Sequence, residues 1–205
     1  MNPGDLSAGD MESNIIQAAT SVFVKKGRTG ASMQDIADEA GINRTLLNYY
    51  FRSKEKLFNI VFDEVLNTLI KNAMQILISE KDVLVKIEQF IELYIRTLID
   101  NPQIPVFILN ELSTNPERLI RIVKSQIIQP LPIIKDLEKA MEAGRIIKTD
   151  PHQLIVNLIS LIVFPFAAQP MLSGIFFSDR EVDFGDFMEQ RIAFLKRYFI
   201  KSIII

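Results

Sequence analysis

The 205-residue chain contains no cysteine, no tryptophan and a single histidine, His152. Without cysteine there can be no disulfide framework, no thiolate zinc site and no cysteine nucleophile. One histidine also excludes a zinc site built mainly on imidazoles. Glycine is scarce, at 8 residues, which argues against a turn-rich all-β fold. The sequence therefore favours an all-α protein.

Apolar residues are abundant instead, at 48% of the chain, which is enough for a sizeable buried core. Residues 154–178 carry no charged side chain, and a stretch of that length could cross a membrane. Polar and helix-breaking residues interrupt it, and its acidic flanks lack a basic cluster to anchor at an interface. We expect a buried helix and keep a membrane span as the alternative. The acidic N-terminus lacks the apolar run of a signal peptide, so we expect a cytoplasmic protein.

The net charge of −2 conceals a local asymmetry. Between Met11 and Lys56 there are seven basic residues against five acidic ones, a balance of +2, so the remainder carries −4. A difference of two charges is a weak signal for nucleic acid, and the positions of the charges matter more than the sum.

Helical periodicity and capping signals predict three short helices near the N-terminus, over residues 11–26, 33–40 and 44–51. Gly27 is placed to end the first helix, and Ser32 with Asp35 has the spacing of a capping box for the second. Gly41 breaks the second helix, and Asn43 can cap the third. Three short helices with a glycine-containing turn before the third describe a helix-turn-helix.

Six longer or more apolar helices are expected in the rest of the chain, for about nine in total. Their predicted ranges are 54–79, 82–99, 106–113, 116–143, 151–167 and 183–200, with Pro130 and Pro132 kinking or splitting the fourth of these. The expected organisation is a flexible arm (1–10), a helix-turn-helix domain (11–53) and a larger helical domain (54–205) for ligand binding and dimerisation.

The third helix has two opposite faces. Taking Arg44 as zero and about 100° per residue, Leu47, Tyr50 and Phe51 share an apolar face. Thr45, Asn48 and Tyr49 lie on the other side, with Arg44 at its edge. Arg can pair with guanine and Asn with adenine in the major groove, although a polar face can equally be solvated surface. Lys54, near the start of the next helix, adds a cation beside N-terminal amides that suit a phosphate.

Three segments resemble the TetR family of bacterial transcriptional regulators (TetR/AcrR-like). Residues 41–58, GINRTLLNYYFRSKEKLF, are similar to its turn and recognition helix, and residues 15–27 and 32–40 are similar to its first two helices. The resemblance covers about residues 12–60, and the rest of the chain fits the family in length and helix count. It implies a DNA-binding regulator, a repressor by preference, that reads double-stranded DNA at a palindromic operator as a homodimer.

Carried over by position, the family's phosphate-contacting residues fall on Thr29, Gly30, Ser32, Tyr50 and Lys54. Its base-reading surface falls on Arg44, Thr45, Leu46, Asn48 and Tyr49. Asn48 stands where the family usually has Tyr, and Leu46 where it often has Thr, so no operator can be transferred from a relative. Leu46 could contact a thymine methyl or pack into the core.

The resemblance also implies a dimer interface and a ligand cavity in the remaining helices. Candidates for the interface are the helix 154–167 and, in the last helix, Phe187, Ile192, Phe194, Leu195 and Tyr198. Candidates for the cavity are Tyr94, Phe107, Asn110, Glu111, Phe164, Phe166 and Gln169, although each aromatic could be ordinary core. An apolar lining with few polar groups favours a lipophilic or aromatic effector. Glu111 could instead recognise a cation or face solvent.

An enzyme is the main rival class. The sequence has no glycine-rich phosphate loop, no nucleophile elbow and no cluster of metal ligands. His152 follows Pro151 at an expected helix start, where it is better suited to capping or to solvent than to catalysis. We therefore expect no enzymatic activity, no cofactor and no bound metal. A ligand-independent DNA-binding dimer is the remaining alternative.

Overall fold

The computed structural model describes residues 8–127, 131–177 and 183–205, and these residues form an all-α structure. Eleven helices lie within them: α1 (Ala8–Gly30), α2 (Met33–Glu39), α3 (Arg44–Tyr50), α4 (Lys54–Leu77), α5 (Val83–Asp100), α6 (Ile104–Thr114), α7 (Pro116–Gln126), α8 (Pro132–Glu142), α9 (Pro151–Ala167), α10 (Gln169–Phe176) and α11 (Phe184–Ile203).

The count exceeds the predicted nine because the expected helix 116–143 is split, as its prolines allow, and because α10 follows the expected helix 151–167 as an additional helix. The segment 116–143 forms α7 and α8, and Pro132 occupies the first turn of α8. The uncharged segment forms α9 and α10, whose axes differ by 71°, with Pro170 in the first turn of α10. Most of the expected N-terminal arm lies outside the described residues, but Ala8, Gly9 and Asp10 already belong to α1.

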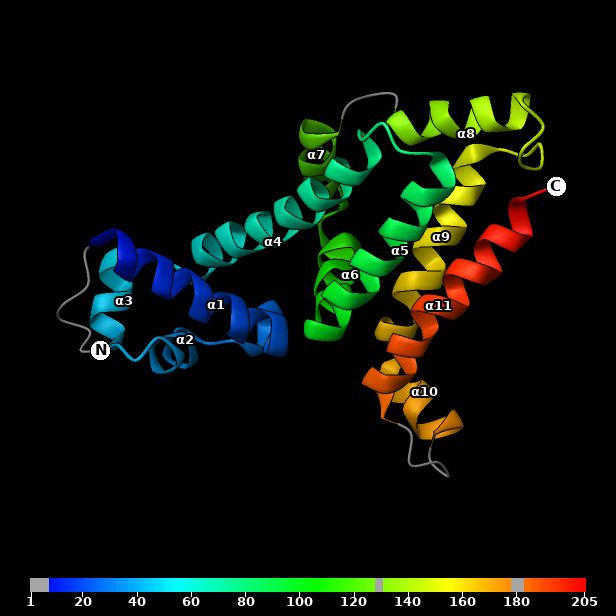
Figure 1. Ribbon diagram of the computed structural model, residues 1–205. Helices are drawn as coiled ribbons and strands as arrows, with labels where there is room; N and C mark the ends of the chain where they lie inside the picture. Colours follow the sequence, from blue (N-terminus) through cyan, green and yellow to red (C-terminus); the bar gives the residue numbers. More distant parts are fainter. Residues whose placement is uncertain (1–7, 128–130, 178–182) are drawn as a thin grey trace.

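Helices α1–α3, which we call the head, pack around one small core (Figure 1). Ile15, Phe23, Ile36 and Leu47 are fully buried there. As predicted, Ser32 and Asp35 form a reciprocal capping box at the start of α2. Burial of one apolar face on each of the three helices stabilises a unit that none of the helices could form alone.

The turn between α2 and α3 depends on Gly41. This residue has φ +67°, a left-handed conformation that side chains with a Cβ rarely adopt. The amide of Gly41 donates to the carbonyl of Asp38, and the amide of Ile42 donates to that of Ala37. These two bonds make a Schellman motif, which ends α2 and directs the chain into α3. The side chain of Asn43 then caps α3 by accepting from the amide of Leu46 at 2.8 Å.

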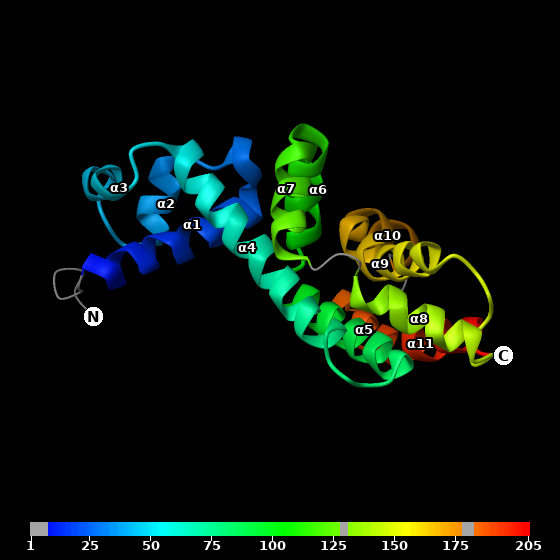
Figure 2. The same ribbon diagram turned by 90° about the horizontal axis from the view of Figure 1, so that it is seen from above.

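Helix α4 joins the head to the rest of the molecule. It is 24 residues long, and its first turns contribute Leu57, Phe58 and Val61 to the core of the head. Its other end lies beside α5 (Figure 2). A side-chain movement at one end of a continuous helix can therefore be passed to the other end as a rigid-body tilt.

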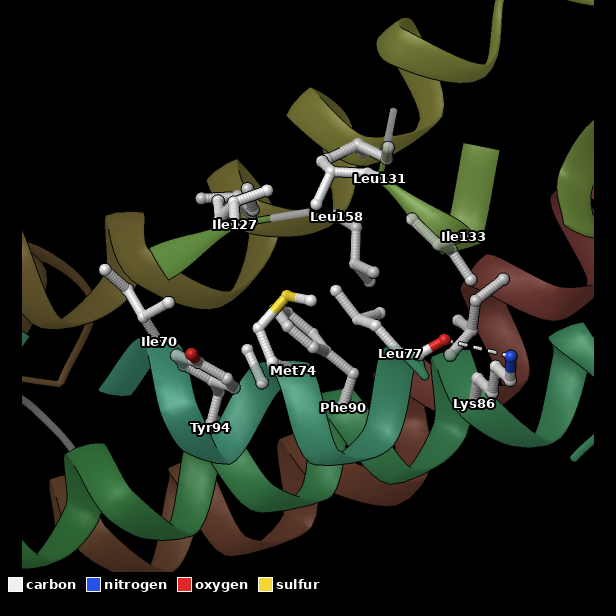
Figure 3. A pocket seen from close by; sticks show the side chains of 14 residues that line it. Ile70, Met74, Leu77, Lys86, Phe90, Tyr94, Ile127, Leu131, Ile133 and Leu158 are labelled. Atoms are coloured by element: carbon white, nitrogen blue, oxygen red, sulfur yellow. Dashed lines mark hydrogen bonds between the residues drawn. The ribbon is translucent and has the colours of Figure 1, made fainter. Parts of the chain in front are cut away.

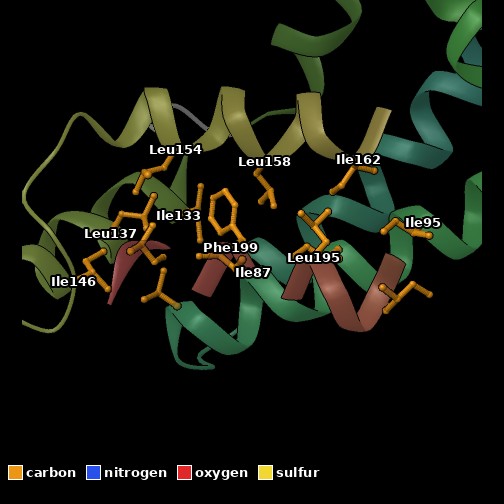
Figure 4. Packing of buried hydrophobic residues seen from close by; sticks show 14 of the residues in the cluster. Ile87, Ile95, Ile133, Leu137, Ile146, Leu154, Leu158, Ile162, Leu195 and Phe199 are labelled. Atoms are coloured by element: carbon orange, nitrogen blue, oxygen red, sulfur yellow. The ribbon is translucent and has the colours of Figure 1, made fainter. Parts of the chain in front are cut away.

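Helices α5–α11, which we call the body, contain a second core. Helix α5 packs along α11, and α8 and α9 cover them (Figure 4). Most of the fully buried residues of this second core are aliphatic, among them Ile91, Ile95, Leu137 and Leu195. Helices α6 and α7 lie closer to the head, and Phe107 of α6 belongs to the head's hydrophobic cluster.

Within the described residues, no single helix is long and apolar enough to span a membrane. Helices α9 and α10 satisfy the length and composition requirement only as a pair, which is bent by 71°.

Candidate functional site

Helix α3 presents the polar face that the sequence indicated. Arg44, Thr45, Asn48 and Tyr49 are exposed, and Tyr49 retains 80% of its accessible surface. Leu47, on the opposite side, is fully buried. The amphipathic pattern thus fixes which side chains are free to meet an external partner. Leu46 is partly buried against the head's core, so its packing role is supported by its position.

The candidate phosphate-contacting residues gather around the beginnings of α2 and α4. Thr29, Gly30 and Ser32 are exposed on the segment that leads into α2. Lys54 lies at the start of α4, and its Nζ donates to the carbonyl of Ala31 at 3.0 Å. That bond ties α4 to the segment before α2, so these groups share one side of the head. Tyr50 is partly buried and meets Tyr49 edge to face, with ring centroids 5.5 Å apart.

Two further cations near this side are paired with carboxylates of α2 and α4. Lys26 pairs with Asp35 at 2.7 Å, and Arg28 pairs with Glu55 at 2.6 Å. The Lys26 ammonium, followed by the bonds from Ser32, lowers the pKa of Asp35 to about 2. Among the described residues Arg44 has no such carboxylate partner, so its charge is available to an anion.

The body contains an apolar cavity of about 200 Å³ between α4, α5, α8 and α9 (Figure 3). It is lined by Ile70, Ala73, Met74, Leu77, Lys86, Ile87, Phe90, Tyr94, Ile127, Leu131, Ile133, Ile155, Leu158 and Ile159. An engineered cavity of about 150 Å³ with similar lining stays dry and binds benzene-sized molecules. This cavity is therefore suited to a small neutral apolar molecule.

The polar groups in the cavity wall are directed at the protein itself. Lys86 is only 3% exposed, and its Nζ donates to the carbonyl of Leu77 at 3.0 Å and to Oδ2 of Asp136 at 2.6 Å. The hydroxyl of Tyr94 donates to the carbonyl of Leu69 at 2.8 Å. Burial raises the pKa of Tyr94 to about 12, so the hydroxyl remains a neutral donor. An effector in the cavity would meet hydrocarbon rather than a free charge.

Of the seven residues predicted to line a cavity, only Tyr94 lines this one. Phe107, Asn110 and Glu111 border a different hollow, between α6 and the end of α1. Phe164 is 58% exposed, and Phe166 is buried against Phe184. Gln169 lies in the first turn of α10, and none of these six contributes to the lining. Helical periodicity separates buried from exposed positions, but it does not show which buried positions surround a void.

A polar cluster that the sequence did not reveal joins α4, α6 and α7. Arg118, 8% exposed, donates to the side chain and carbonyl of Asn59 and pairs with Asp63 and Glu111. Its guanidinium also lies over the ring of Phe62, 4.9 Å from the centroid. Glu111, which the sequence offered as a cation ligand or a solvated group, is 3% exposed and pairs with Arg118 instead. Arg118 follows a proline in the first turn of α7, where a basic residue gives no hint of burial.

Exposed apolar side chains lie on α9 and α11. On α9 they include Val156 and Phe164, at 57% and 58% exposure. On α11, Phe194 and Tyr198 are about half exposed and stack on each other, with centroids 5.8 Å apart. Ile192 and Leu195, also named as interface candidates, are buried in the body's core, and Phe187 is partly buried. Fewer of the candidate residues are therefore exposed to a second copy than the sequence suggested.

Comparisons with known proteins agree with this arrangement. Residues 15–61 match the family described as bacterial regulatory proteins, tetR family. A 52-residue segment is 44% identical to the HTH-type transcriptional repressor NicS of Pseudomonas putida, covering 25% of this chain and 24% of NicS. A longer segment of 145 residues is 29% identical to the HTH-type transcriptional regulator RutR of Escherichia coli O157:H7, covering 69% of this chain and 66% of RutR.

The fold resembles that of solved regulators over almost the whole chain. The ketosteroid transcriptional regulator KstR2 of Mycobacterium tuberculosis matches with a TM-score of 0.68 at 16% identity, covering 98% of each chain. The predicted all-α architecture with an N-terminal helix-turn-helix is confirmed, and the matching family is one of regulators rather than enzymes. The chain belongs to the TetR family of bacterial transcriptional regulators.

Proposed function

We propose that this protein is a transcriptional repressor that binds a palindromic operator as a homodimer and is released by a neutral lipophilic or aromatic molecule. It would act on DNA in the cytoplasm. The observation that carries the proposal is the exposed face of Arg44, Thr45, Asn48 and Tyr49 on a helix that Asn43 caps and Leu47 anchors.

DNA binding is supported by two separate groups of side chains, one suited to base edges and the other to phosphates. Arg44 and Asn48 supply the donors and acceptors that read base edges, and Tyr49 is free to pack against them. Thr29, Ser32, Tyr50 and the spare donors of Lys54 are placed to hold phosphates, with the amide of Gly30 beside them. Phosphate contacts fix the orientation of the head, and α3 can then read sequence in the major groove.

Dimerisation is supported by the apolar surface of α9 and α11. Phe164, Phe194 and Tyr198 would lose contact with water if two copies paired through this surface, and burial of apolar area favours association. Two-fold pairing makes the same surface meet itself. The two copies of α3 would then lie one DNA turn apart, at about 34 Å, or at a multiple of it.

A test of DNA binding is a footprint on the DNA that flanks the protein's own gene, at two salt concentrations. We expect a protected palindrome and an affinity that falls steeply with salt, because each neutralised phosphate releases counterions. A binding constant that does not change with salt would contradict the proposed phosphate contacts.

A test of dimerisation is sedimentation of Phe164→Glu alongside the native protein. A carboxylate on this surface should convert the dimer to monomers and abolish the two-site footprint, because a charge buried at an interface is costly. The matched control is Phe176→Glu, an equally exposed phenylalanine on α10. A monomeric native protein that still protects a palindrome would refute this part of the proposal.

A further inference from the structure

A second hollow lies at the junction of the head and the body, between the end of α1 and α6 (Figure 1). Its volume is about 440 Å³, roughly twice that of the apolar cavity, and polar side chains make up much of its wall. Gly27 has the left-handed φ of +68°, and the next two residues, Arg28 and Thr29, border the hollow. The apolar cavity and the exposed face of α3 lie elsewhere, so the proposed function leaves this hollow without a role.

The α6 side of the hollow offers hydrogen-bond acceptors. Glu111 lines it and is only 3% exposed, so its carboxylate is shielded from bulk water. The hydroxyls of Ser113 and Thr114 also line it, and each donates its proton to the carbonyl of Asn110, at 3.0 and 2.9 Å. Because a hydroxyl has a single proton, these two oxygens can only accept from an occupant.

The carboxylate of Glu111 is incompletely neutralised. Arg118 bonds Oε1 of Glu111 at 3.3 Å and also pairs with Asp63. One guanidinium thus serves two carboxylates, and the cluster keeps an excess negative charge. Asp63 is half exposed whereas Glu111 is buried, so Glu111 gains more from a further cation, because an unbalanced buried charge is costly.

Two aromatic rings form the floor of the hollow. Phe58 and Phe107 meet edge to face there, with ring centroids 5.6 Å apart. The guanidinium of Arg28 already lies over the Phe58 ring, 5.4 Å from its centroid. Aromatic faces attract cations, and the rings also present an apolar surface. A molecule that carries both a cation and hydrocarbon therefore suits this floor.

The cations at the mouth of the hollow are engaged with other carboxylates. Lys26 and Arg28 are about half exposed and pair with Asp35 and Glu55. They lie nearer to solvent than Glu111, and neither of them forms an ion pair with it. The hollow therefore has acceptors at its buried end and donors at its mouth.

We propose that this hollow binds a small organic molecule whose primary ammonium group meets Glu111 and whose apolar part lies on the rings of Phe58 and Phe107. The ammonium would donate to the carboxylate of Glu111 and to the hydroxyl oxygens of Ser113 and Thr114, which matches its three protons. Such an occupant contacts α1 and α4 of the head and α6 of the body at once. The site shares no lining residue with the apolar cavity, and its occupancy is measurable without DNA.

A primary ammonium group occurs both on simple amines and on amino acids, which carry a carboxylate as well. The carboxylate of an amino acid would face the mouth, where Lys26 and Arg28 keep donors beyond those used in their ion pairs. Phenethylamine and phenylalanine therefore distinguish the two sources. The alcohol 2-phenylethanol has the same ring and chain but no charge, so it tests whether the ammonium is needed.

The test is titration calorimetry of the full chain with these three probes. Glu111→Gln removes the charge but keeps the size of the side chain. Ser113→Phe blocks the hollow from an exposed position, where the added ring costs the fold little. Leu158→Phe is the matched control, because it fills the apolar cavity instead. Circular dichroism checks that each variant is folded.

We expect the native protein to bind phenethylamine with a Kd on the order of 1 mM or tighter, as suits a ligand of this size. Both the change to 2-phenylethanol and the Glu111→Gln substitution should weaken binding by roughly ten- to a hundredfold, the range for hydrogen bonds to charged groups. Ser113→Phe should abolish binding, and Leu158→Phe should leave it unchanged. Tighter binding of phenylalanine would identify an amino acid as the occupant, and equal or weaker binding a simple amine.

Binding of 2-phenylethanol as tight as that of phenethylamine would overturn the proposal, because the charge of Glu111 would then play no part. Binding that Leu158→Phe removes and Ser113→Phe preserves would also overturn it, since the probe would then occupy the apolar cavity. So would the absence of binding by both ammonium probes. If Glu111→Gln failed to fold, Ser113→Phe and the alcohol would still decide the place of binding and the need for charge. A failure of operator binding would refute the proposed function and leave these titrations unaffected.

Discussion

The head and the body begin their helices in different ways. In the head and at its junction with α4, the side chains of Ser32, Asn43 and Ser53 each accept a hydrogen bond from an amide three residues on. In the body, Asp82, Asn115, Asp150 and Asp183 cap α5, α7, α9 and α11, but α6, α8 and α10 begin with proline in the first turn and without a side-chain cap bond. Nearby side chains thus specify the starts of α2, α3 and α4, whereas α6, α8 and α10 in the body depend on packing between distant residues.

The sharpest challenge to this comparison is Phe107, a body residue in the head's core. It is 4% exposed, and its ring centroid lies 5.6 Å from that of Phe58 and 5.4 Å from that of Phe62. Phe107→Ala should lower the free energy of unfolding by about 3–5 kcal/mol, the usual cost of emptying such a site. Urea denaturation measures the loss, and hydrogen exchange in α1 shows whether the head shares it.

Phe176→Ala is the control, because that ring is 62% exposed and its removal leaves no buried cavity. If Phe107→Ala cost less than about 1 kcal/mol, the head's core would be complete without α6. The head would then be a separate unit in stability as well as in sequence.

The second prediction concerns the Arg118 cluster, where the body holds α4. Arg118→Met should cost about 3 kcal/mol, because it leaves the Glu111 carboxylate buried without its cation. Adding Glu111→Gln should recover part of the loss. Arg96→Met breaks the exposed pair with Glu189 and should cost at most about 1 kcal/mol. Equal losses for the two arginines in thermal or urea unfolding would show that burial does not distinguish them.

The same contrast explains what could be predicted from the sequence. The capping box at Ser32, the Gly41 turn and the exposed face of α3 were all predicted, since each depends on residues within one or two helical turns. The presence of body helices was predicted as well, from apolar periodicity. The eleven helices of the described residues slightly exceed the predicted nine: the prolines of 116–143 already indicated a split, and α10 is the helix that the apolar pattern did not separate from α9.

The cavity and the Arg118 cluster could not be obtained in this way. Ile and Leu are nearly interchangeable in periodicity, so the pattern cannot show that Ile155 and Leu158 line a void while Leu154 and Ile162 fill the core. One signal was available: Lys86 lies three residues after Val83 on the apolar face of α5, where a charge indicates a buried partner. No comparable signal marks Arg118.

The third prediction separates base recognition from phosphate contact on the head. Arg44→Ala should reduce discrimination at one base pair by about 1–3 kcal/mol, because Arg44 is exposed on the reading face. Lys54→Ala should weaken binding to all sequences alike and make the salt slope shallower by about one unit. Fluorescence anisotropy with the footprinted duplex and single-base variants measures both. A change of base preference in Lys54→Ala would show that the two roles are not divided between these residues.

The smallest effect concerns the acid stability of the head. The pKa of Asp35 is lowered to about 2, first by Lys26 and then by Ser32, from an ordinary value of 3.8. A carboxyl whose folded-state pKa is lowered stabilises the fold above pH 3.8, and the stabilisation is lost as the pH falls toward 2. Native protein should therefore exceed Asp35→Asn in stability near neutral pH, and the difference should close below pH 3.8. Circular dichroism during acid unfolding measures it.

Asp38→Asn, on the same helix, is the matched control, since Asp38 accepts a hydrogen bond from the neutral side chain of Gln34. The stability difference for Asp35 should also shrink in high salt, because the Lys26–Asp35 pair is exposed and screened. A difference that persisted unchanged through acid and salt would mean that Asp35 acts through its geometry as a cap alone. The charge of Lys26 would then contribute nothing to the stability of the head.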